Sequence, residues 1–282
     1  MGGRRSVFVV SMMAFGFAFL YVPILSMIFF SFNNSRLVTV WDADDSPTLK
    51  WYRTLLSNEQ ILGAAWLSIK VAAVTATGAV ILGTLAGLVL TRFGPFRGRT
   101  LLSGMTTAPL VMPEVITGLS LLLLFVFLEQ LIGWPQGRGF ATIVIAHVTF
   151  AMAYVTVVVQ SRLATFDDSL EEAALDLGAR PAKVFFRITL PLILPAILSG
   201  WLLAFTLSWD DLVISQFVAG PGSTTLPMVV FSKVRLGVSP DINALATIMV
   251  TIVGLGVVLS ALYMRRQERR LALEMQMAKA EK

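Results

Sequence analysis

Long apolar runs separated by short polar segments dominate this chain. Six stretches are nearly free of charge and long enough for a helix of roughly 20 apolar residues to cross a hydrocarbon core of about 30 Å. They run approximately over residues 7–32, 62–91, 104–128, 140–161, 192–218 and 242–264. Because lipid offers backbone groups no partners beyond their own helical hydrogen bonds, the pattern predicts an all-α polytopic membrane protein with six transmembrane helices.

The connections between these spans carry weaker helical signals. The first span follows Arg4 and Arg5 like a secretory signal, but its apolar run is longer than a signal's, so we expect a retained anchor. Residues 33–60 are rich in turn formers and then show apolar positions at helical spacing, which favours a short helix at the membrane surface. Part of residues 219–241 is expected to re-enter or cap the bundle.

Composition agrees with a membrane location and excludes several other classes. The chain is 56% hydrophobic and 14% charged with a mean hydropathy of +0.78, too apolar for one water-facing domain of 282 residues. It has no Cys and a single His, so disulfides are excluded and neither a structural metal nor a cofactor is expected. We expect a single transmembrane domain over residues 1–282, with no internal repeat.

The basic residues indicate an orientation rather than a nucleic-acid partner. The net charge is +5, but Lys and Arg lie in short clusters beside the spans instead of along one folded face. Placing both termini in the cytoplasm puts most of these residues on the cytoplasmic side. The tail with Arg265, Arg266, Arg269 and Arg270 is then expected near anionic membrane lipid.

The segment 162–191, between the fourth and fifth spans, reads as a helix–turn–helix. Ser169 followed by Glu172 has capping-box spacing, Gly178 suits a helix end, and Pro181 suits the first turn of a second helix. One face of the first helix is apolar or small, whereas its acidic residues, Glu171, Glu172 and Asp176, point elsewhere. That face consists of Leu170, Ala173, Ala174 and Leu177. Periodicity alone fits docking of a partner and packing on the chain's own bundle equally well.

The spacing within this segment is more specific than its periodicity. Glu172-Ala173-Ala174 is followed after three residues by Gly178, and after nine more by Ile188-Thr189-Leu190-Pro191. This pattern resembles the EAA loop of ABC importer permeases, the cytoplasmic loop through which an ATPase moves the membrane helices. The resemblance implies the type I importer permease fold. It also implies an ATPase-coupling set: Glu171, Glu172, Ala173, Ala174, Leu177, Gly178, Ile188, Leu190 and Pro191.

The chain itself shows no motif for ATP hydrolysis. No Gly-x-x-x-x-Gly-Lys-Ser/Thr phosphate loop occurs in it, so ATP hydrolysis would be supplied by a separate chain, and no catalytic residue is expected here.

Two further runs point to a substrate class. SWDDLVI over residues 208–214 and GPGSTTLP over residues 220–227 resemble the fifth-helix region of polyamine permeases, especially the putrescine type. The resemblance implies a polyamine substrate and a bacterial inner membrane. It also implies as partners two copies of an ATP-binding subunit, a second homologous permease subunit and a periplasmic polyamine-binding protein.

Two adjacent carboxylates are the strongest candidates for a substrate pathway. Asp210 and Asp211 lie inside the fifth predicted span, where a charge is costly and usually marks a pathway or a partner. Asp211 shares a polar stripe with Ser208, and Trp209 offers an aromatic face to a cation. The alternative is structural. One aspartate would then pair with Lys70, Lys233 or Arg235, or would cap a helix break.

Glu114 is a further pathway candidate. It follows Pro109 and Pro113 and precedes Gly118, and prolines so placed can open a helix so that a carboxylate lines a cavity. An inward-facing structural partner is an equally good interpretation.

Three patterns leave other interpretations open. Ser120 and His147 could form the nucleophile and base of an intramembrane serine protease, although a histidine bonded between helices is the simpler interpretation. An ion-gradient-driven carrier of a cationic solute would use one of the pathway carboxylates for coupling. Ala79, Gly83 and Gly87 form a small-residue stripe that suits packing within the chain or between subunits.

Overall fold

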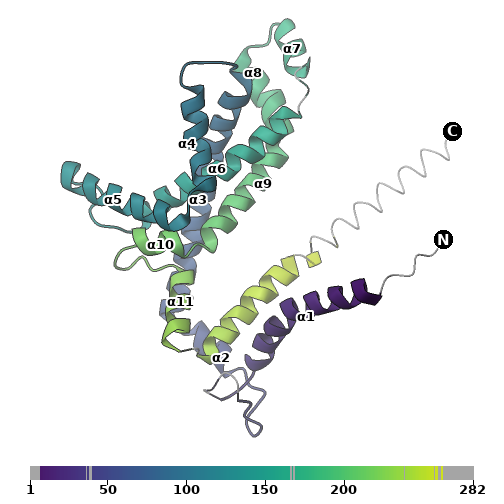
Figure 1. The fold of residues 1–282 in the computed structure, drawn as a ribbon, viewed down its shortest axis with the longest axis vertical. Helices are drawn as coiled ribbons and strands as arrows, with labels where there is room; N and C mark the ends of the chain where they lie inside the picture. Colours follow the sequence, from purple (N-terminus) through teal and green to yellow (C-terminus); the bar gives the residue numbers. More distant parts are fainter. Residues whose placement is uncertain are drawn as a thin grey trace, which may run out of the picture. The chain divides into compact units, whose positions relative to one another are not determined.

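The computed structural model describes residues 7–35, 37, 40–165, 167, 169–237, 239–256, 258–259 and 262. Every regular element in this part of the chain is helical (Figure 1). The elements are α1 (Val7–Phe30), α2 (Lys50–Leu56), α3 (Glu59–Arg92), α4 (Arg99–Val111), α5 (Glu114–Ile132), α6 (Phe140–Ala164), α7 (Ser169–Asp176), α8 (Pro181–Val184), the π-helix η1 (Phe185–Thr189), α9 (Leu190–Trp209), α10 (Val213–Val218) and α11 (Leu226–Leu236). A further apolar helix, Pro240–Gly256, follows α11.

The chain forms two compact units. One contains residues 1–59 and 232–282, and the other contains residues 60–231. The candidate functional residues all lie in the second unit.

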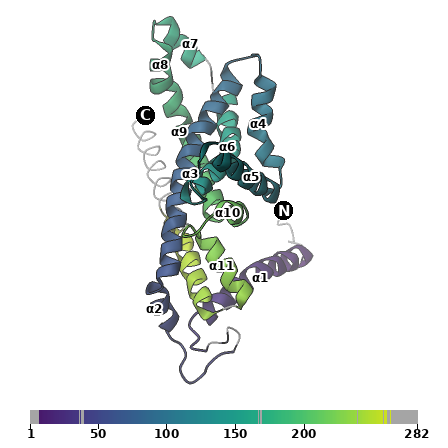
Figure 2. The ribbon, with the colours of Figure 1, turned by 90° about the vertical axis from the view of Figure 1, so that its left-hand side faces the viewer.

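The second unit is a helical bundle organised around α6. Helices α3, α6 and α9 run alongside one another in both views (Figures 1 and 2), while α10 packs against α5 and α6. The core between α3, α6 and α9 consists mainly of small and β-branched side chains. Its fully buried members are Ala76, Ala79, Ala151, Val155, Val159, Leu163, Ile193 and Ala204.

The small-residue stripe on α3 packs within the chain. A Cβ atom added to Gly83 would lie 2.8 Å from Cβ of Val155 and 2.9 Å from the carbonyl oxygen of Met152. At Gly87 the nearest atom would be Cγ1 of Val159, at 3.1 Å. The missing side chains therefore let α3 approach the backbone of α6, and intra-chain packing accounts for this stripe.

Two predicted spans are each divided into two helices. The stretch 104–128 was expected as one helix, but α4 ends at Val111, Met112 is extended (ψ 135°), and Pro113 precedes the first residue of α5. Proline has no N–H for a helical bond and disfavours helical geometry in the residue before it, so the break falls at Met112. The stretch 192–218 is likewise divided, because α9 ends at Trp209 and α10 begins at Val213.

The first unit contains the N-terminal helix and the surface helix expected after it. Helix α1 has no buried residue and is apolar on all sides, as expected for a membrane anchor. The buried Asn33 organises the loop that follows: its Nδ2 donates to the Val40 carbonyl (2.6 Å), and its Oδ1 accepts from the Asp42 N–H (2.9 Å). Lys233 forms an ion pair with Asp241 and so ties α11 to the following helix.

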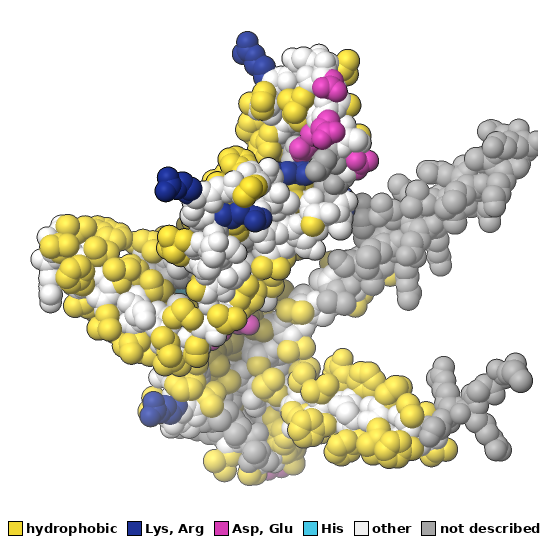
Figure 3. Space-filling model, turned by 45° about the horizontal axis from the view of Figure 1, so that its top comes forward, with side chains coloured by type: hydrophobic (Ala, Val, Ile, Leu, Met, Phe, Trp, Pro, Cys, Tyr) yellow, Lys and Arg dark blue, Asp and Glu magenta, His cyan; other side chains and the backbone are white. Residues whose placement is uncertain are grey.

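Five described helices are long and apolar enough to cross a membrane: α1, α3, α5, α6 and the continuous segment Pro181–Trp209. Figure 3 shows hydrophobic side chains covering much of α1 and α5, the pattern of lipid-facing or partner-facing helices. Helix Pro240–Gly256 is shorter, and both the N-terminal Arg4 and Arg5 and the basic tail lie outside the described residues. The six-span count and the cytoplasmic termini stay predictions.

Candidate coupling site and pathway residues

The segment between α6 and α9 is a helix–turn–helix, as the sequence predicts, but its first cap differs. Ser169 is the first helical residue of α7, and the oxygen that accepts its backbone N–H belongs to Asp167 (3.0 Å). The expected position of Ser169 at the helix cap is therefore wrong, because Ser169 lies within α7. Hydrogen bonds from the Ser169 side chain and backbone lower the pKa of the Asp167 carboxyl, because they stabilise its charged form.

The turn after α7 depends on Gly178. Its φ is +81°, a left-handed conformation that costs other residues energy. The Gly178 N–H bonds to the Leu175 carbonyl (2.8 Å) and the Ala179 N–H bonds to the Ala174 carbonyl (3.1 Å), which is the Schellman arrangement. Pro181 then starts α8, as predicted. The turn fixes the angle between α7 and α8.

Helix α7 leaves an apolar surface uncovered. It has no buried residue, and Leu177 is 89% exposed although it is one of the largest apolar side chains in the segment. Leu170, Glu172 and Ala173 are also exposed, whereas Ala174 is half-buried. Figure 3 shows Asp and Glu side chains gathered around the end of the unit that carries α7. Of the remaining predicted coupling residues, Ile188 and Leu190 are half-buried and Pro191 is exposed.

Glu171 is also half-buried, and its carboxylate contacts the chain's own bundle. Its Oε1 accepts a hydrogen bond from the buried Thr189 hydroxyl at 2.5 Å. The same oxygen lies 3.9 Å from Nη2 of Arg92, the last residue of α3. One carboxylate oxygen thus joins α7 to the ends of two other helices.

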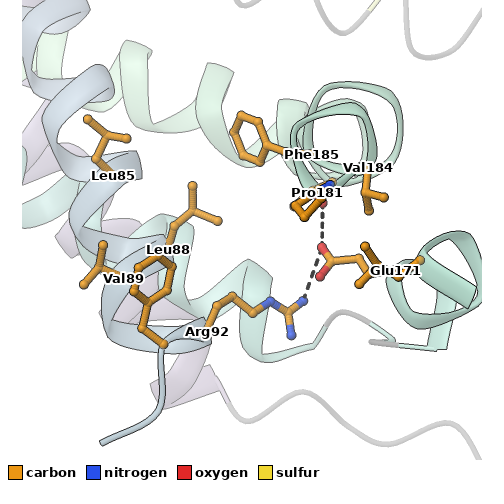
Figure 4. A pocket seen from close by; sticks show the side chains of 11 residues that line it. Leu85, Leu88, Val89, Arg92, Glu171, Pro181, Val184 and Phe185 are labelled. Atoms are coloured by element: carbon orange, nitrogen blue, oxygen red, sulfur yellow. Dashed lines mark hydrogen bonds and ion pairs between the residues drawn. The ribbon is translucent and has the colours of Figure 1, made fainter. Parts of the chain in front are cut away.

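These contacts border a largely apolar cavity of about 390 Å³ (Figure 4). Its walls come from the last turns of α3, from one side of α7, and from α8 with η1. They consist of Leu85, Leu88, Val89, Arg92, Phe93, Glu171, Leu175, Pro181, Val184, Phe185 and Thr189. Figure 4 shows the Arg92 side chain extending from α3 toward Glu171, with Pro181 and Phe185 on the opposite wall.

The connection from α8 to the long helix α9 is a single turn of π-helix. η1 covers Phe185–Thr189 and continues directly into α9 at Leu190. Such turns are rare and are often found at functional positions. Nothing in the residue pattern of this stretch, FFRIT, indicated it.

A buried polar network holds the break between α9 and α10. Asp211 Oδ2 lies 3.0 Å from His147 Nε2 on α6, and the same carboxylate accepts hydrogen bonds from the backbone N–H groups of Ile214 and Ser215. His147 Nδ1 lies 2.7 Å from the Ser208 hydroxyl. Asp211 therefore caps α10 and ties it to α6, in keeping with the predicted alternative of a carboxylate at a helix break.

The partner of Asp211 is not one that the sequence suggested. Lys70, Lys233 and Arg235 were the expected cations, but the Lys70 ammonium lies over the Trp66 ring at 5.8 Å, and Lys233 pairs with Asp241. The sequence left His147 either as a base for Ser120 or, more simply, as a histidine bonded between helices. The second interpretation agrees with the structure, where the ring nitrogens are occupied by Ser208, Asp211 and Ser215. Nothing in the spacing indicated that residues 64 positions apart would meet.

The remaining pathway candidates stand apart from this network. Asp210 is the exposed residue directly after α9, and Trp209 beside it lies nearly parallel to Phe205, with ring centroids 6.2 Å apart. Glu114 is exposed in the first turn of α5. The structure brings Ser208 and Asp211 together, but within the part of the chain that it describes no hydrogen bond or ion pair joins Asp210 or Glu114 to them.

Comparison with known proteins agrees with this architecture. Residues 79–273 match the family model described as "Binding-protein-dependent transport system inner membrane component". The chain is 56% identical over 275 residues to the putrescine transport system permease protein PotI of Escherichia coli K12, covering 98% of this chain and 97% of that protein. It is 41% identical over 249 residues to the spermidine/putrescine transport system permease protein PotC of the same strain, covering 88% and 90%.

Solved structures share the fold at low sequence identity. A bacterial ABC transporter involved in importing the acidic polysaccharide alginate superposes with a TM-score of 0.69 at 17% identity, over 93% of this chain and 98% of that chain. The MetNI methionine ABC transporter in an inward-facing conformation gives a TM-score of 0.57 at 16% identity, over 71% and 92%. The chain has the ABC importer permease fold and belongs to the family of binding-protein-dependent transport system inner membrane components.

Proposed function

We propose that this chain is a permease subunit of an ATP-driven importer of putrescine or a closely related polyamine in a bacterial inner membrane. The observation that supports the substrate best is the 56% identity to a putrescine permease along almost the whole length of both chains. The chain contributes half of the translocation pathway and leaves ATP hydrolysis to a separate subunit.

The exposed side of the helix–turn–helix formed by α7 and α8 is the docking surface for that ATPase. A helix pair with no buried residue in α7 and an 89% exposed Leu177 needs a partner to cover its apolar side. The rigid turn at Gly178 gives the partner a fixed shape to bind. Two copies of the ATP-binding subunit serve the pair formed by this chain and a second homologous permease. A periplasmic polyamine-binding protein delivers the substrate.

Asp210 is the better of the two adjacent carboxylates for contacting the polyamine. Asp211 is already occupied by His147 and by two backbone N–H groups, so its lone pairs are directed into the protein. Asp210 is exposed and neighbours Trp209, whose ring lies parallel to that of Phe205. A carboxylate beside aromatic rings offers an ammonium group both Coulomb attraction and a cation–π contact. Glu114 would contribute a second carboxylate from α5.

Reconstitution tests the proposed function. The tagged full-length chain is purified in mild detergent together with whatever co-elutes, inserted into vesicles, and supplied with a polyamine-binding protein, ATP and labelled putrescine. We expect a nucleotide-binding subunit and a second permease to co-elute, and uptake to require ATP. Uptake by the chain alone, driven by an ion gradient, would overturn the proposal.

A further inference from the structure

We propose that Glu171 is a positioning residue that locks the coupling helix α7 to the end of α3, so that force applied to α7 reaches two membrane helices. This inference rests on the proposed function, because it concerns how the docking surface transmits motion. The resemblance to the EAA loop assigns Glu171 no contact with the chain's own bundle.

The contacts of Glu171 reach both of the helices that would have to move. Thr189 is 3% exposed and is the last residue of η1, directly before α9, so the 2.5 Å bond from its hydroxyl ties α7 to the start of α9. Arg92 is the last residue of α3, where a positive charge is also favoured by the helix dipole. Its guanidinium lies 3.9 Å from the same carboxylate oxygen.

The surroundings make these contacts stronger than those of a typical surface pair. The Arg92 and Glu171 side chains are 19% and 21% exposed and border an apolar cavity, where water competes less for their charges. Two residues of α7 line the cavity, Glu171 and Leu175, which lies one turn further along the helix. Glu171 therefore contributes polar contacts from α7 to the end of α3 and to the end of η1.

The π-helical turn explains why such an attachment is needed. The chain passes from α8 to α9 through η1, a single π-helical turn in which backbone bonds span five residues instead of four. A push on α7 could then be absorbed by bending at η1. With Thr189 and Arg92 both held by Glu171, the displacement is passed to α9 and α3 together.

The test measures the ratio of putrescine taken up to ATP hydrolysed in vesicles that contain the complete complex. Glu171→Ala removes both contacts, and Asp45→Asn is the control because it removes one negative charge from an exposed position outside the docking surface. We expect Glu171→Ala to keep its co-purifying ATPase and to hydrolyse ATP, while the uptake per ATP falls by about tenfold, the effect of losing one charge-assisted hydrogen bond. Asp45→Asn should retain the wild-type ratio.

A second variant separates positioning from folding. Exchanging the charges, with Glu171→Arg combined with Arg92→Glu, should recover part of the ratio lost in either single variant, which a simple folding defect would not allow. An unchanged ratio in Glu171→Ala, in a complex whose wild type couples uptake to hydrolysis, would overturn this inference alone. If the wild-type chain shows no ATP-dependent uptake, the proposed function fails instead.

Discussion

His147 on α6 and Asp211, the residue that caps α10, are 64 positions apart in the sequence, and His147 Nε2 lies 3.0 Å from Asp211 Oδ2 in the interior of the bundle. A carboxylate only accepts hydrogen bonds, so the contact fits an imidazole whose Nε2 carries hydrogen. Ser208 then completes the ring's bonding at Nδ1. This pair fixes the position of the helix break beside which Asp210 is exposed.

Removing His147 should destabilise the bundle more than it changes substrate affinity. His147→Ala leaves the buried Asp211 carboxylate without its imidazole partner, at a cost of about 1–3 kcal/mol. We expect a lower thermal unfolding temperature in detergent for the assembled complex. Thr149→Ala on the same helix is the control, because Thr149 is half-buried and its hydroxyl bonds to the Ile145 carbonyl one turn back rather than to another helix. Equal unfolding temperatures for the two variants would contradict the structural role of His147.

The Asp210→Asn and Asp211→Asn variants should have different effects in transport assays. Asp210→Asn removes an exposed negative charge while leaving the cap of α10 in place, so KM for putrescine should rise by about tenfold with normal amounts of protein in the membrane. Asp211→Asn should mainly lower the amount of folded protein, because the buried network loses its charge. The reverse result, normal kinetics in Asp210→Asn and raised KM in a stable Asp211→Asn, would assign the pathway to Asp211.

Substitutions at Gly178 should be tolerated according to how readily the new residue adopts the left-handed conformation of this position. At φ +81° a β-branched residue is strained by about 1–2 kcal/mol, whereas Asn adopts this conformation more readily. Gly178→Val should therefore weaken retention of the ATPase during purification more than Gly178→Asn does. Equal retention in both variants would show that the Schellman turn does not set the docking geometry.

The close approach of α3 and α6 predicts that stability depends on which glycine of α3 is replaced. Gly83→Ala places a methyl group 2.8 Å from Val155 Cβ and 2.9 Å from a backbone oxygen, so the helices must separate. We expect a lower unfolding temperature, corresponding to about 1–3 kcal/mol. Gly63→Ala on the same helix meets nothing within 4 Å and serves as the control. A Gly83 variant as stable as the Gly63 variant would refute the packing assigned to this stripe.

The sequence predicted α1, α3 and α6 as continuous apolar helices, because the bilayer dictates their length. It also predicted the helix–turn–helix of α7 and α8, because Gly178 and Pro181 have strong local preferences. It did not predict how helices distant in the chain meet. The partner of Asp211 and the attachment of Glu171 to Arg92 both depend on tertiary packing. The division of the third predicted span at Met112 follows from Pro113, but the apolar run on either side concealed it.

For the coupling residues, too, the local pattern was predictable and the tertiary contacts were not. Periodicity placed Leu177 and Glu171 on different faces of the helix, yet it could not tell which face the chain's own bundle covers; in the structure Leu177 is exposed and Glu171 contacts the bundle. The answer depends on the position of Thr189, which lies 18 residues away and is oriented by a π-helical turn without a local sequence signal.

The most direct test of the docking surface uses the absence of cysteine from the chain. A single Leu177→Cys variant in native membranes is treated with a thiol-reactive cross-linker and, separately, with a membrane-impermeant maleimide added from the periplasmic side. If the exposed side of α7–α8 docks the ATPase, we expect a cross-link to a nucleotide-binding subunit and no labelling from the periplasm. Labelling from the periplasm without any cross-link to a nucleotide-binding subunit would contradict it.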